Sequence, residues 1–407
     1  MPLIRPFAGL RPVADHAEDV VAPPYDVLNS AEARERAAGK PWSFLHISKA
    51  EIDLPENTDP YDLAVYAKAA ENMQKMIKAG ILMRDTAPRY YVYRLTMGQH
   101  VQTGLVAAAS VKDYDSNRIR KHEFTRPAKE DDRVRQIEAL NAQTGPVLLA
   151  YKSEPELDQL LAQVASGKPV YDLKADDGIG HSFWVVEDEA IINKFSAGFD
   201  SMKAIYIADG HHRSAAASRV AAKKGGGEND MSQYFLSVIF PHNQMNILDY
   251  NRVITDLNGL SQEDFLEKIK HSFSCVKESA AVSPRKANEF GMYLKGEWYR
   301  LAISPELVPT DPVKRLDVSL LADNLLQPVL GIVDPRTDSR IDFVGGIRGL
   351  KELEKRVNSG EMAVAFSMFP TSMEDLMAVA DDNQVMPPKS TWFEPKLADG
   401  LVSHLLD

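Results

Sequence analysis

Residues 203–224 contain an apolar segment that runs directly into a helix-forming one, and this junction is the strongest constraint that the sequence places on the fold. The apolar segment KAIYIAD predicts a buried strand, and HHRSAAASRVAAKK predicts a helix that ends at the flexible stretch GGGEND. A strand that turns into a helix at Asp-Gly presents free backbone N–H groups and the positive end of the helix dipole. The junction therefore predicts an anion-binding site.

The residue types at this junction suit a phosphate group. Gly210 permits a tight turn and a close approach of the ligand. Arg213 offers a bidentate fork, and His211 and His212 can donate to phosphate oxygens or move a proton. Asp209 can hold a divalent cation such as Mg²⁺. The alternative is a capping aspartate with solvated histidines, but this density of polar residues directly after a buried strand favours the phosphate site.

Apolar patterns along the rest of the chain predict a mixture of helices and strands. Helices are expected at 30–40, 60–80, 133–143, 263–273, 315–330, 348–358 and 372–381. Strands are expected at 89–97, 103–111, 145–151, 181–186, 234–240 and 362–369, with a hairpin at 289–303. This mixture predicts an α+β fold with α/β segments. We place an N-terminal part at 1–250, with the phosphate-binding core at about 110–250, and a C-terminal part at 251–407.

The composition limits the classes of function. The net charge of −11 argues against broad binding to nucleic acid, which needs a basic face, but allows a small basic pocket for a phosphorylated metabolite. No run of about 18 apolar residues is present, so we expect no membrane span. The single cysteine, Cys275, excludes a disulfide framework and a thiolate zinc cluster. The N-terminal residues MPLIRPFAGLRPV lack a signal-peptide pattern, and we expect a cytoplasmic location.

A second candidate segment is RIRKHEFTRPAKEDDRVRQ at 118–136, where charges of both signs alternate around a proline. Glu123 is a candidate general base. The basic residues that could neutralise phosphates are Arg126, Lys129 and Arg133. Asp131 and Asp132 could cap the following helix or ligate Mg²⁺. The alternative is a solvated loop before an amphipathic helix.

A third candidate segment is VMPPKSTWFEPKL at 385–397, where two prolines hold the backbone extended. Its possible phosphate donors are Lys389, Ser390 and Thr391. The alternative is a packing corner. Weaker candidates for substrate binding come from the segments APPYDV, DYNR and DFVGGIRGL; they are Tyr25, Asp26, Asn251, Arg252 and Arg348.

Several motifs of well-known enzyme classes are missing from the sequence. It contains neither a P-loop nor G-x-G-x-x-G, and no G-x-S-x-G nucleophile elbow. A catalytic zinc is disfavoured, because His211 and His212 are adjacent and diverge, and because His122-Glu123 lacks a second histidine one turn later.

Six motifs spread along the chain carry a family resemblance. In order they are APPYDV, KHEFTRPAKEDDR, YIADGHHR, YNRV, RIDFVGGIRG and MPPKSTWFEPKL. Together they resemble the family known as domain of unknown function 1015 (DUF1015), over essentially the whole chain. The family name itself carries no function.

The segment DGHHRSAAA has a wider resemblance. It is similar to the phosphate-binding G-x-x-R box of the ParB/sulfiredoxin superfamily, and its Asp-Gly-His-His-Arg form resembles that of the free-serine kinases, which phosphorylate L-serine with a nucleotide. In those enzymes a glutamate in a His-Glu segment acts as base, and the matching segment here is KHEFTRPAKEDDRVRQIEAL. The resemblance implies Glu123 as base, Arg213 as phosphate ligand, and Asp209 and His212 in catalysis or Mg²⁺ binding. It covers about residues 110–220 and implies a ParB/sulfiredoxin-like core with added N- and C-terminal α/β segments.

These observations predict a phosphotransferase acting on a small hydroxy amino acid, either a nucleotide-dependent serine kinase or the reverse reaction from phosphoserine to serine in serine metabolism. The expected cofactors are Mg²⁺ and ATP or ADP. The expected partners are small molecules, and we expect binding to neither nucleic acid nor membrane. A homodimer is possible. Two alternatives stay open. A metal-dependent phosphatase would release phosphate without nucleotide, and a non-catalytic nucleotide-binding switch or DNA-partitioning-like protein would need the basic surface that the net charge disfavours.

Overall fold

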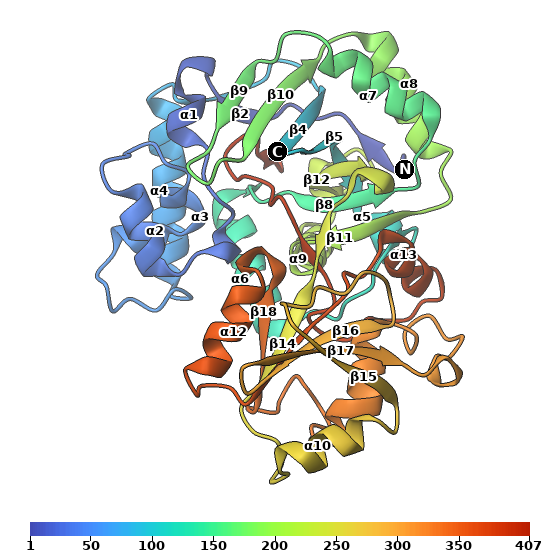
Figure 1. Cartoon of the computed structure of the whole chain (residues 1–407). Coiled ribbons are helices and arrows are strands. Elements are labelled where there is room, and N and C mark those ends of the chain that lie inside the picture. The colour runs from blue at the N-terminus through green and yellow to red at the C-terminus, as the bar shows by residue number, and fades with distance from the viewer. The chain divides into compact units, whose positions relative to one another are not determined.

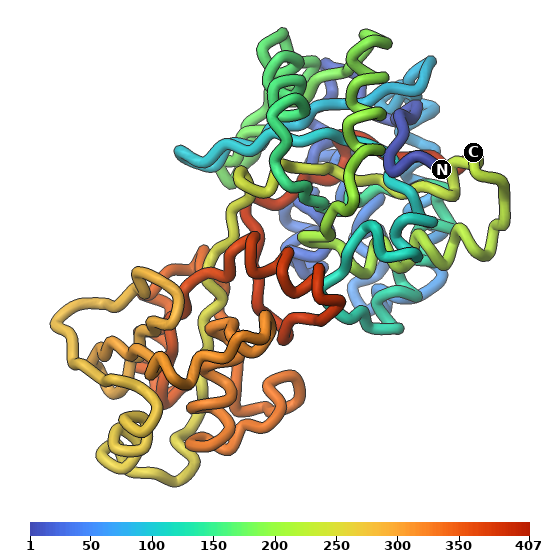
Figure 2. The backbone as a smooth tube through the Cα atoms, turned by 90° about the vertical axis from the view of Figure 1, so that its right-hand side faces the viewer, coloured from blue at the N-terminus to red at the C-terminus, as the bar shows by residue number.

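The structure is a computed structural model that describes all 407 residues, and the chain divides into two compact units. The first unit comprises Met1–Met245 and Pro395–Asp407, and both ends of the chain belong to it (Figure 2). The second unit comprises Asn246–Glu394. The C-terminal part expected from the sequence runs to residue 407, whereas residues 395–407 return to the first unit. Helices and strands are mixed in both units, which confirms the predicted α+β class.

The first unit is built on a nine-stranded sheet of mixed direction (Figure 1). The strand order is β6-β11-β8-β12-β5-β4-β10-β9, and β1 pairs with β5. The strands are β1 (Ile4–Arg5), β4 (Tyr90–Met97), β5 (His100–Ser110), β6 (Ile119–Arg120), β8 (Val147–Tyr151), β9 (Tyr171–Lys174), β10 (Gly180–Val186), β11 (Ile205–Asp209) and β12 (Tyr234–Pro241). Every residue of β8 and β12 is buried, as their continuous apolar sequences predict.

Nine helices and two short strand pairs complete the first unit. The helices are α1 (Ala17–Val20), α2 (Ser30–Ala37), α3 (Leu45–Ser48), α4 (Leu63–Lys78), α5 (Val111–Asp115), α6 (Pro127–Leu140), α7 (Pro155–Ala165), α8 (Glu189–Asp200) and α9 (His211–Lys224). The short pairs are β2 (Leu10–Pro12) with β3 (Leu82–Arg84), and β7 (Ala142–Gln143) with β21 (His404–Leu405). Apolar residues of α7, α8 and α9 pack with those of the sheet in one core, and α1 to α4 share a second core.

The second unit has a six-stranded antiparallel sheet of order β15-β17-β16-β19-β14-β18. Its strands are β14 (Tyr250–Ile254), β15 (Phe273–Glu278), β16 (Glu289–Leu294), β17 (Glu297–Ile303), β18 (Ile341–Gly345) and β19 (Val364–Ser367), with a separate pair β13 (Ile247–Leu248) and β20 (Trp392–Phe393). Its helices are α10 (Gln262–Ile269), α11 (Asp317–Leu321), α12 (Leu350–Asn358) and α13 (Met373–Asp381). No helix in either unit combines the length and the apolar character needed to cross a membrane.

Most elements expected from the sequence are confirmed, but three helices have wrong bounds. Of the helix predicted at 315–330, only α11 (Asp317–Leu321) is α-helical, and a π-helical segment follows at Ala322–Leu326. The predicted helix 263–273 ends at Ile269, and its last residue begins β15. The helix predicted to start at 133 is α6, which starts at Pro127, because proline is well tolerated in the first helical turn. Asp131 and Asp132 therefore lie inside α6, and the prediction that they cap it is wrong.

The turn between β11 and α9 depends on Gly210. Its φ of +104° lies in the left-handed region, and its carbonyl accepts the first hydrogen bond of α9, from Ser214 N at 3.0 Å. A Cβ atom at this position would lie 2.9 Å from Arg213 Nε. The turn therefore needs glycine both for its backbone conformation and for the close approach of the Arg213 side chain.

The returning C-terminal segment buries a carboxyl group. Asp399 is 1% exposed, and its backbone exchanges hydrogen bonds with Ala22, N to O at 2.9 Å and O to N at 3.1 Å. Its Oδ1 atom is buried without a hydrogen-bond partner. Burial raises the pKa of Asp399 to about 7, against the lowering effect of the Arg213 charge.

We predict that Gly210→Ala destabilises the protein more than Gly39→Ala. Gly39 also has a positive φ, +75°, but nothing lies within 4 Å of its Cβ position, so its substitution adds only backbone strain of about 1–2 kcal/mol. Gly210→Ala adds the collision with Arg213. Urea unfolding followed by circular dichroism measures both losses, and equal losses would contradict the steric role of Gly210.

We predict that Asp399→Asn stabilises the protein in a pH-dependent way. Between about pH 4 and 7 the folded state keeps a proton that the unfolded state releases, so the stability of the wild type falls as the pH rises and levels off above 7. Asparagine does not ionise, so it avoids this loss of stability, which reaches about 4 kcal/mol at pH 8. Unfolding free energies of both proteins from pH 4 to 8 test this, and a difference that does not change with pH would refute it.

Candidate functional site

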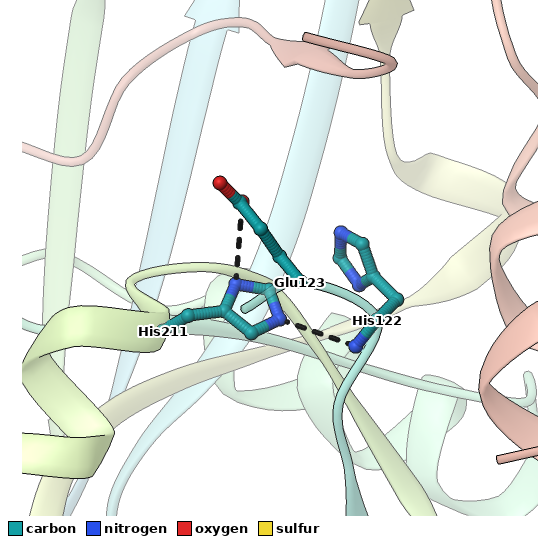
Figure 3. A group of neighbouring side chains, drawn as sticks. All are labelled: His122, Glu123 and His211. Carbon is teal, nitrogen blue, oxygen red and sulfur yellow. Dashed lines mark hydrogen bonds and ion pairs between the residues drawn. The ribbon is translucent and has the colours of Figure 1, made fainter. Parts of the chain in front are cut away.

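The loop 121–126 connects β6 to α6 and is attached to the first turn of α9. Two of its backbone N–H groups donate to imidazole rings of that helix. His122 N donates to His211 Nε2 at 3.4 Å, and Arg126 N donates to His212 Nε2 at 3.0 Å. Figure 3 shows the loop beside the start of the helix, with Glu123 directed toward the His211 ring. The two hydrogen bonds therefore bring Glu123 to the strand–helix junction.

The His211 ring presents an N–H group to Glu123. The ring is 4% exposed. Burial is the largest cause that lowers its pKa well below the ordinary value, and the neighbouring His122 is the second. The ring is therefore neutral at pH 7. Because Nε2 accepts a hydrogen bond, the proton of the neutral ring is on Nδ1. His211 Nδ1 lies 3.8 Å from Glu123 Oε2 (Figure 3). This distance is longer than a hydrogen bond, so the ring N–H faces the carboxylate without being bonded to it.

His122, Glu123 and His211 are also close enough together to ligate one metal ion. One ligand atom from each of His122, Glu123 and His211 lies within 4.8 Å of the others. The His122 ring is buried, which lowers its pKa to about 4, and its Nδ1 has no hydrogen-bond partner. However, a metal ion would have to displace the Nδ1 proton of His211 or break its hydrogen bond from His122 N. The arrangement therefore suits a carboxylate that faces a ring N–H better than a metal centre.

Asp209 and Arg213 form an ion pair at the end of β11. Arg213 donates through NH2 to Asp209 Oδ2 at 2.9 Å and through NH1 to Pro146 O at 2.9 Å. Burial alone would raise the pKa of Asp209, but the charges of Lys396 and Arg213 hold it at about 2. The carboxylate is thus ionised, and it remains 39% exposed. It is the group at this junction that best fits a divalent cation.

Tyr25 and Asp26 come to the same place from a distant part of the chain. Asp26 Oδ2 lies 4.0 Å from Arg213 NH2. The Arg133 guanidinium lies over the Tyr25 ring, 3.9 Å from its centroid. Burial raises the pKa of Tyr25 to about 12, so its hydroxyl stays protonated at neutral pH. Tyr25 and Asp26, which the sequence predicts for substrate binding, therefore lie next to Arg213 together with Arg133.

The remaining basic candidates of the first unit have structural contacts. Arg126 contributes its backbone N–H to His212, as described above. Lys129 donates to Tyr61 Oη at 2.6 Å. His212, predicted to be catalytic, thus holds the loop in place through its Nε2 atom, and its pKa is lowered by burial.

Six predicted residues lie in the second unit. They are Asn251, Arg252, Arg348, Lys389, Ser390 and Thr391. Arg252 NH2 donates to Lys389 O at 3.1 Å, and Ser390 Oγ donates to Pro387 O at 2.6 Å. Asn251 Oδ1 accepts from Met368 N at 2.9 Å. These contacts are those of packing, and a role in ligand binding stays a prediction for all six residues.

Sequence reasoning missed two residues of the first-unit site. His122 was considered only as a zinc ligand, although it directly precedes Glu123 in the segment KHEF. Asp399 was not considered, and its one local signal is a charged residue within the apolar segment LADGLV. Its position next to Arg213 follows only from the return of the C-terminus to the first unit.

Comparisons with solved structures find remote similarities. A free serine kinase in complex with AMP has a TM-score of 0.36 and 12% identity, over 73% of this chain and 92% of the kinase. SbnI from Staphylococcus aureus, truncated at its C-terminus, has a TM-score of 0.40 and 10% identity, over 72% and 85% of the two chains. A conserved hypothetical protein from Pyrococcus furiosus has a TM-score of 0.34 and 16% identity, over 73% and 94%.

The sequence comparison is more specific. No curated protein matches the chain. The family described as protein of unknown function (DUF1015) matches residues 4–319. Because this match covers more than half of the chain, and in agreement with the six motifs, the protein belongs to the DUF1015 family.

Proposed function

We propose that this protein transfers a phosphoryl group between a nucleotide, ATP or ADP, and the hydroxyl group of a small hydroxy amino acid, with L-serine as the first candidate. The observation that carries the proposal is the attachment of the Glu123 loop to the first turn of α9. It puts a carboxylate next to a helix N-terminus that follows a strand and an Asp-Gly turn. A base and an anion site thus share one place.

Phosphoryl transfer requires mainly positioning and neutralisation of charge. The free N–H groups and the dipole at the start of α9 favour the negative oxygens of a phosphate. Arg213 lies over Gly210 at this point and brings a guanidinium that is fixed by Asp209 and Pro146. A fixed donor costs little reorganisation when charge develops on the transferring group.

Glu123 is the base of the proposed reaction. Its side chain is 52% exposed, so a substrate hydroxyl can reach it. As the hydroxyl oxygen bonds to phosphorus and the bond to the nucleotide oxygen breaks, the hydroxyl proton passes to the Glu123 carboxylate. The His211 N–H group faces that carboxylate. In the opposite direction the protonated Glu123 returns the proton to the serine oxygen.

Asp209 is the proposed ligand of Mg²⁺, since its carboxylate is ionised and partly exposed. A bound Mg²⁺ ion supplies further neutralisation of the nucleotide phosphates. The choice of L-serine is supported by the resemblance of the DGHHR segment and the KHEF segment to the free-serine kinases, residue by residue at Asp209, Arg213 and Glu123.

We predict that Glu123→Gln lowers phosphoserine formation at least about 100-fold, because the amide cannot accept the proton. Nucleotide affinity, measured by titration calorimetry, should stay within a few-fold of the wild type. Glu35→Gln, on the exposed side of α2, is the matched control and should leave turnover unchanged. Turnover of Glu123→Gln near the wild-type rate would exclude Glu123 as the base.

We predict that Arg213→Lys weakens nucleotide binding by about 1.5–3 kcal/mol, the value of a hydrogen bond to a charged group. Lysine keeps the positive charge opposite Asp209 but loses the planar fork. The control is Arg219→Lys on the same helix, where the arginine is half-exposed and pairs with Asp131 at 2.7 Å. If calorimetry finds the same nucleotide affinity in both variants, Arg213 is not a phosphate ligand.

A further inference from the structure

A small cavity in the first unit adjoins both Arg133 and Arg213. The space open to the centre of a water molecule is about 30 Å³. Its polar lining includes both arginines, Tyr25, Gln143 and Thr144, and no aspartate or glutamate lines it. Both guanidinium groups are ion-paired outside the cavity, Arg133 with Asp132 and Arg213 with Asp209, while the cavity itself presents only N–H and O–H donors, amide groups and apolar atoms. A ligand with hydrogen-bond acceptors therefore suits it.

Arg133 is fixed in this cavity before any ligand binds. Its Nε and NH2 atoms both donate to Asp132 Oδ2, at 3.0 and 2.7 Å. Asp132 is itself held by Tyr66, whose Oη donates to Oδ1 at 2.8 Å. The Tyr25 ring supports one face of the guanidinium. NH1 takes no part in these hydrogen bonds, so a planar anion can bind a guanidinium whose rotamer entropy is already lost.

The size of the cavity is compatible with a small anionic group. One water-sized atom needs roughly 10–15 Å³ of such space, so this cavity has room for about two or three. That is enough room for the two oxygens of a carboxylate group. The position next to Arg213 adjoins the proposed phosphate site.

We infer that this cavity binds the carboxylate group of the acceptor amino acid, with Arg133 as the recognising side chain. The inference rests on the proposed function for the identity of the acceptor. It predicts that the site distinguishes an amino acid from another small alcohol, because a hydroxyl compound without a carboxylate leaves the free NH1 edge of the guanidinium without an acceptor.

Titration calorimetry on the full-length protein tests the inference without turnover. The probes are L-serine, ethanolamine, which keeps the hydroxyl and amino groups but lacks the carboxylate, and inorganic phosphate. We expect L-serine to bind the wild type at least about ten-fold more tightly than ethanolamine. In Arg133→Lys we expect the affinity for L-serine to fall at least about ten-fold, with ADP affinity unchanged.

Arg133→Lys keeps a positive charge beside Asp132, and circular dichroism checks that it is folded. Arg135→Lys, an exposed position on the same helix, is the matched control and should bind L-serine like the wild type. In a second variant, Thr144→Leu, a larger side chain fills part of the cavity and should weaken L-serine binding with the Asp132–Arg133 pair intact.

Four outcomes would overturn the inference. Two concern the wild type: equal binding of L-serine and ethanolamine, or no binding of L-serine at millimolar concentration. Two concern the variants: normal L-serine affinity in both Arg133→Lys and Thr144→Leu, or variants that lose only the binding of inorganic phosphate. Failure of the proposed function would look different. If L-serine binding depends on Arg133 but no phosphoryl transfer occurs with any nucleotide, the carboxylate site stands and the phosphotransferase does not.

Discussion

The candidate site depends on two hydrogen bonds from backbone N–H groups of one loop to the histidines that begin α9. They connect His122 to His211 and Arg126 to His212, and they are bonds that only neutral imidazoles can accept. Burial lowers the pKa of both rings and so keeps them neutral. The doubled histidine thereby holds the loop beside the helix N-terminus, and Glu123 lies on that loop. The charged groups at the junction are then Asp209, Arg213 and the Glu123 carboxylate.

Around this junction the protein keeps a buried carboxyl group whose ionisation lowers its stability. Asp399 is buried with one oxygen unpaired, and Arg133 and Arg213 lie nearby in ion pairs with Asp132 and Asp209. A chain selected for stability alone would replace such groups by apolar ones. Their concentration at one end of the β11–α9 junction is the pattern expected of a site prepared for charged ligands, in which binding energy offsets the cost of burial.

Local patterns in the sequence predicted the strand–helix junction and most elements, because a continuous apolar strand, a positive-φ glycine and a helical alanine pattern all act over a few residues. The start of α6 was missed, because Pro127 was interpreted as part of a loop and not as a first helical residue. The neighbours of Arg213 could not be predicted from local patterns. Tyr25 and Asp399 reach it from the two ends of the chain, and only the fold of the first unit brings them together.

The most direct test of the account is phosphorus NMR of the purified protein with Mg²⁺ and three mixtures: L-serine with ATP, L-serine with ADP, and phosphoserine with ADP. The account predicts a phosphoserine signal in at least one of the first two mixtures, or ATP formed in the third, with a matching change in the nucleotide signals. Inorganic phosphate released from phosphoserine alone would point instead to a phosphatase. Unchanged spectra in all three mixtures would contradict a serine phosphotransferase.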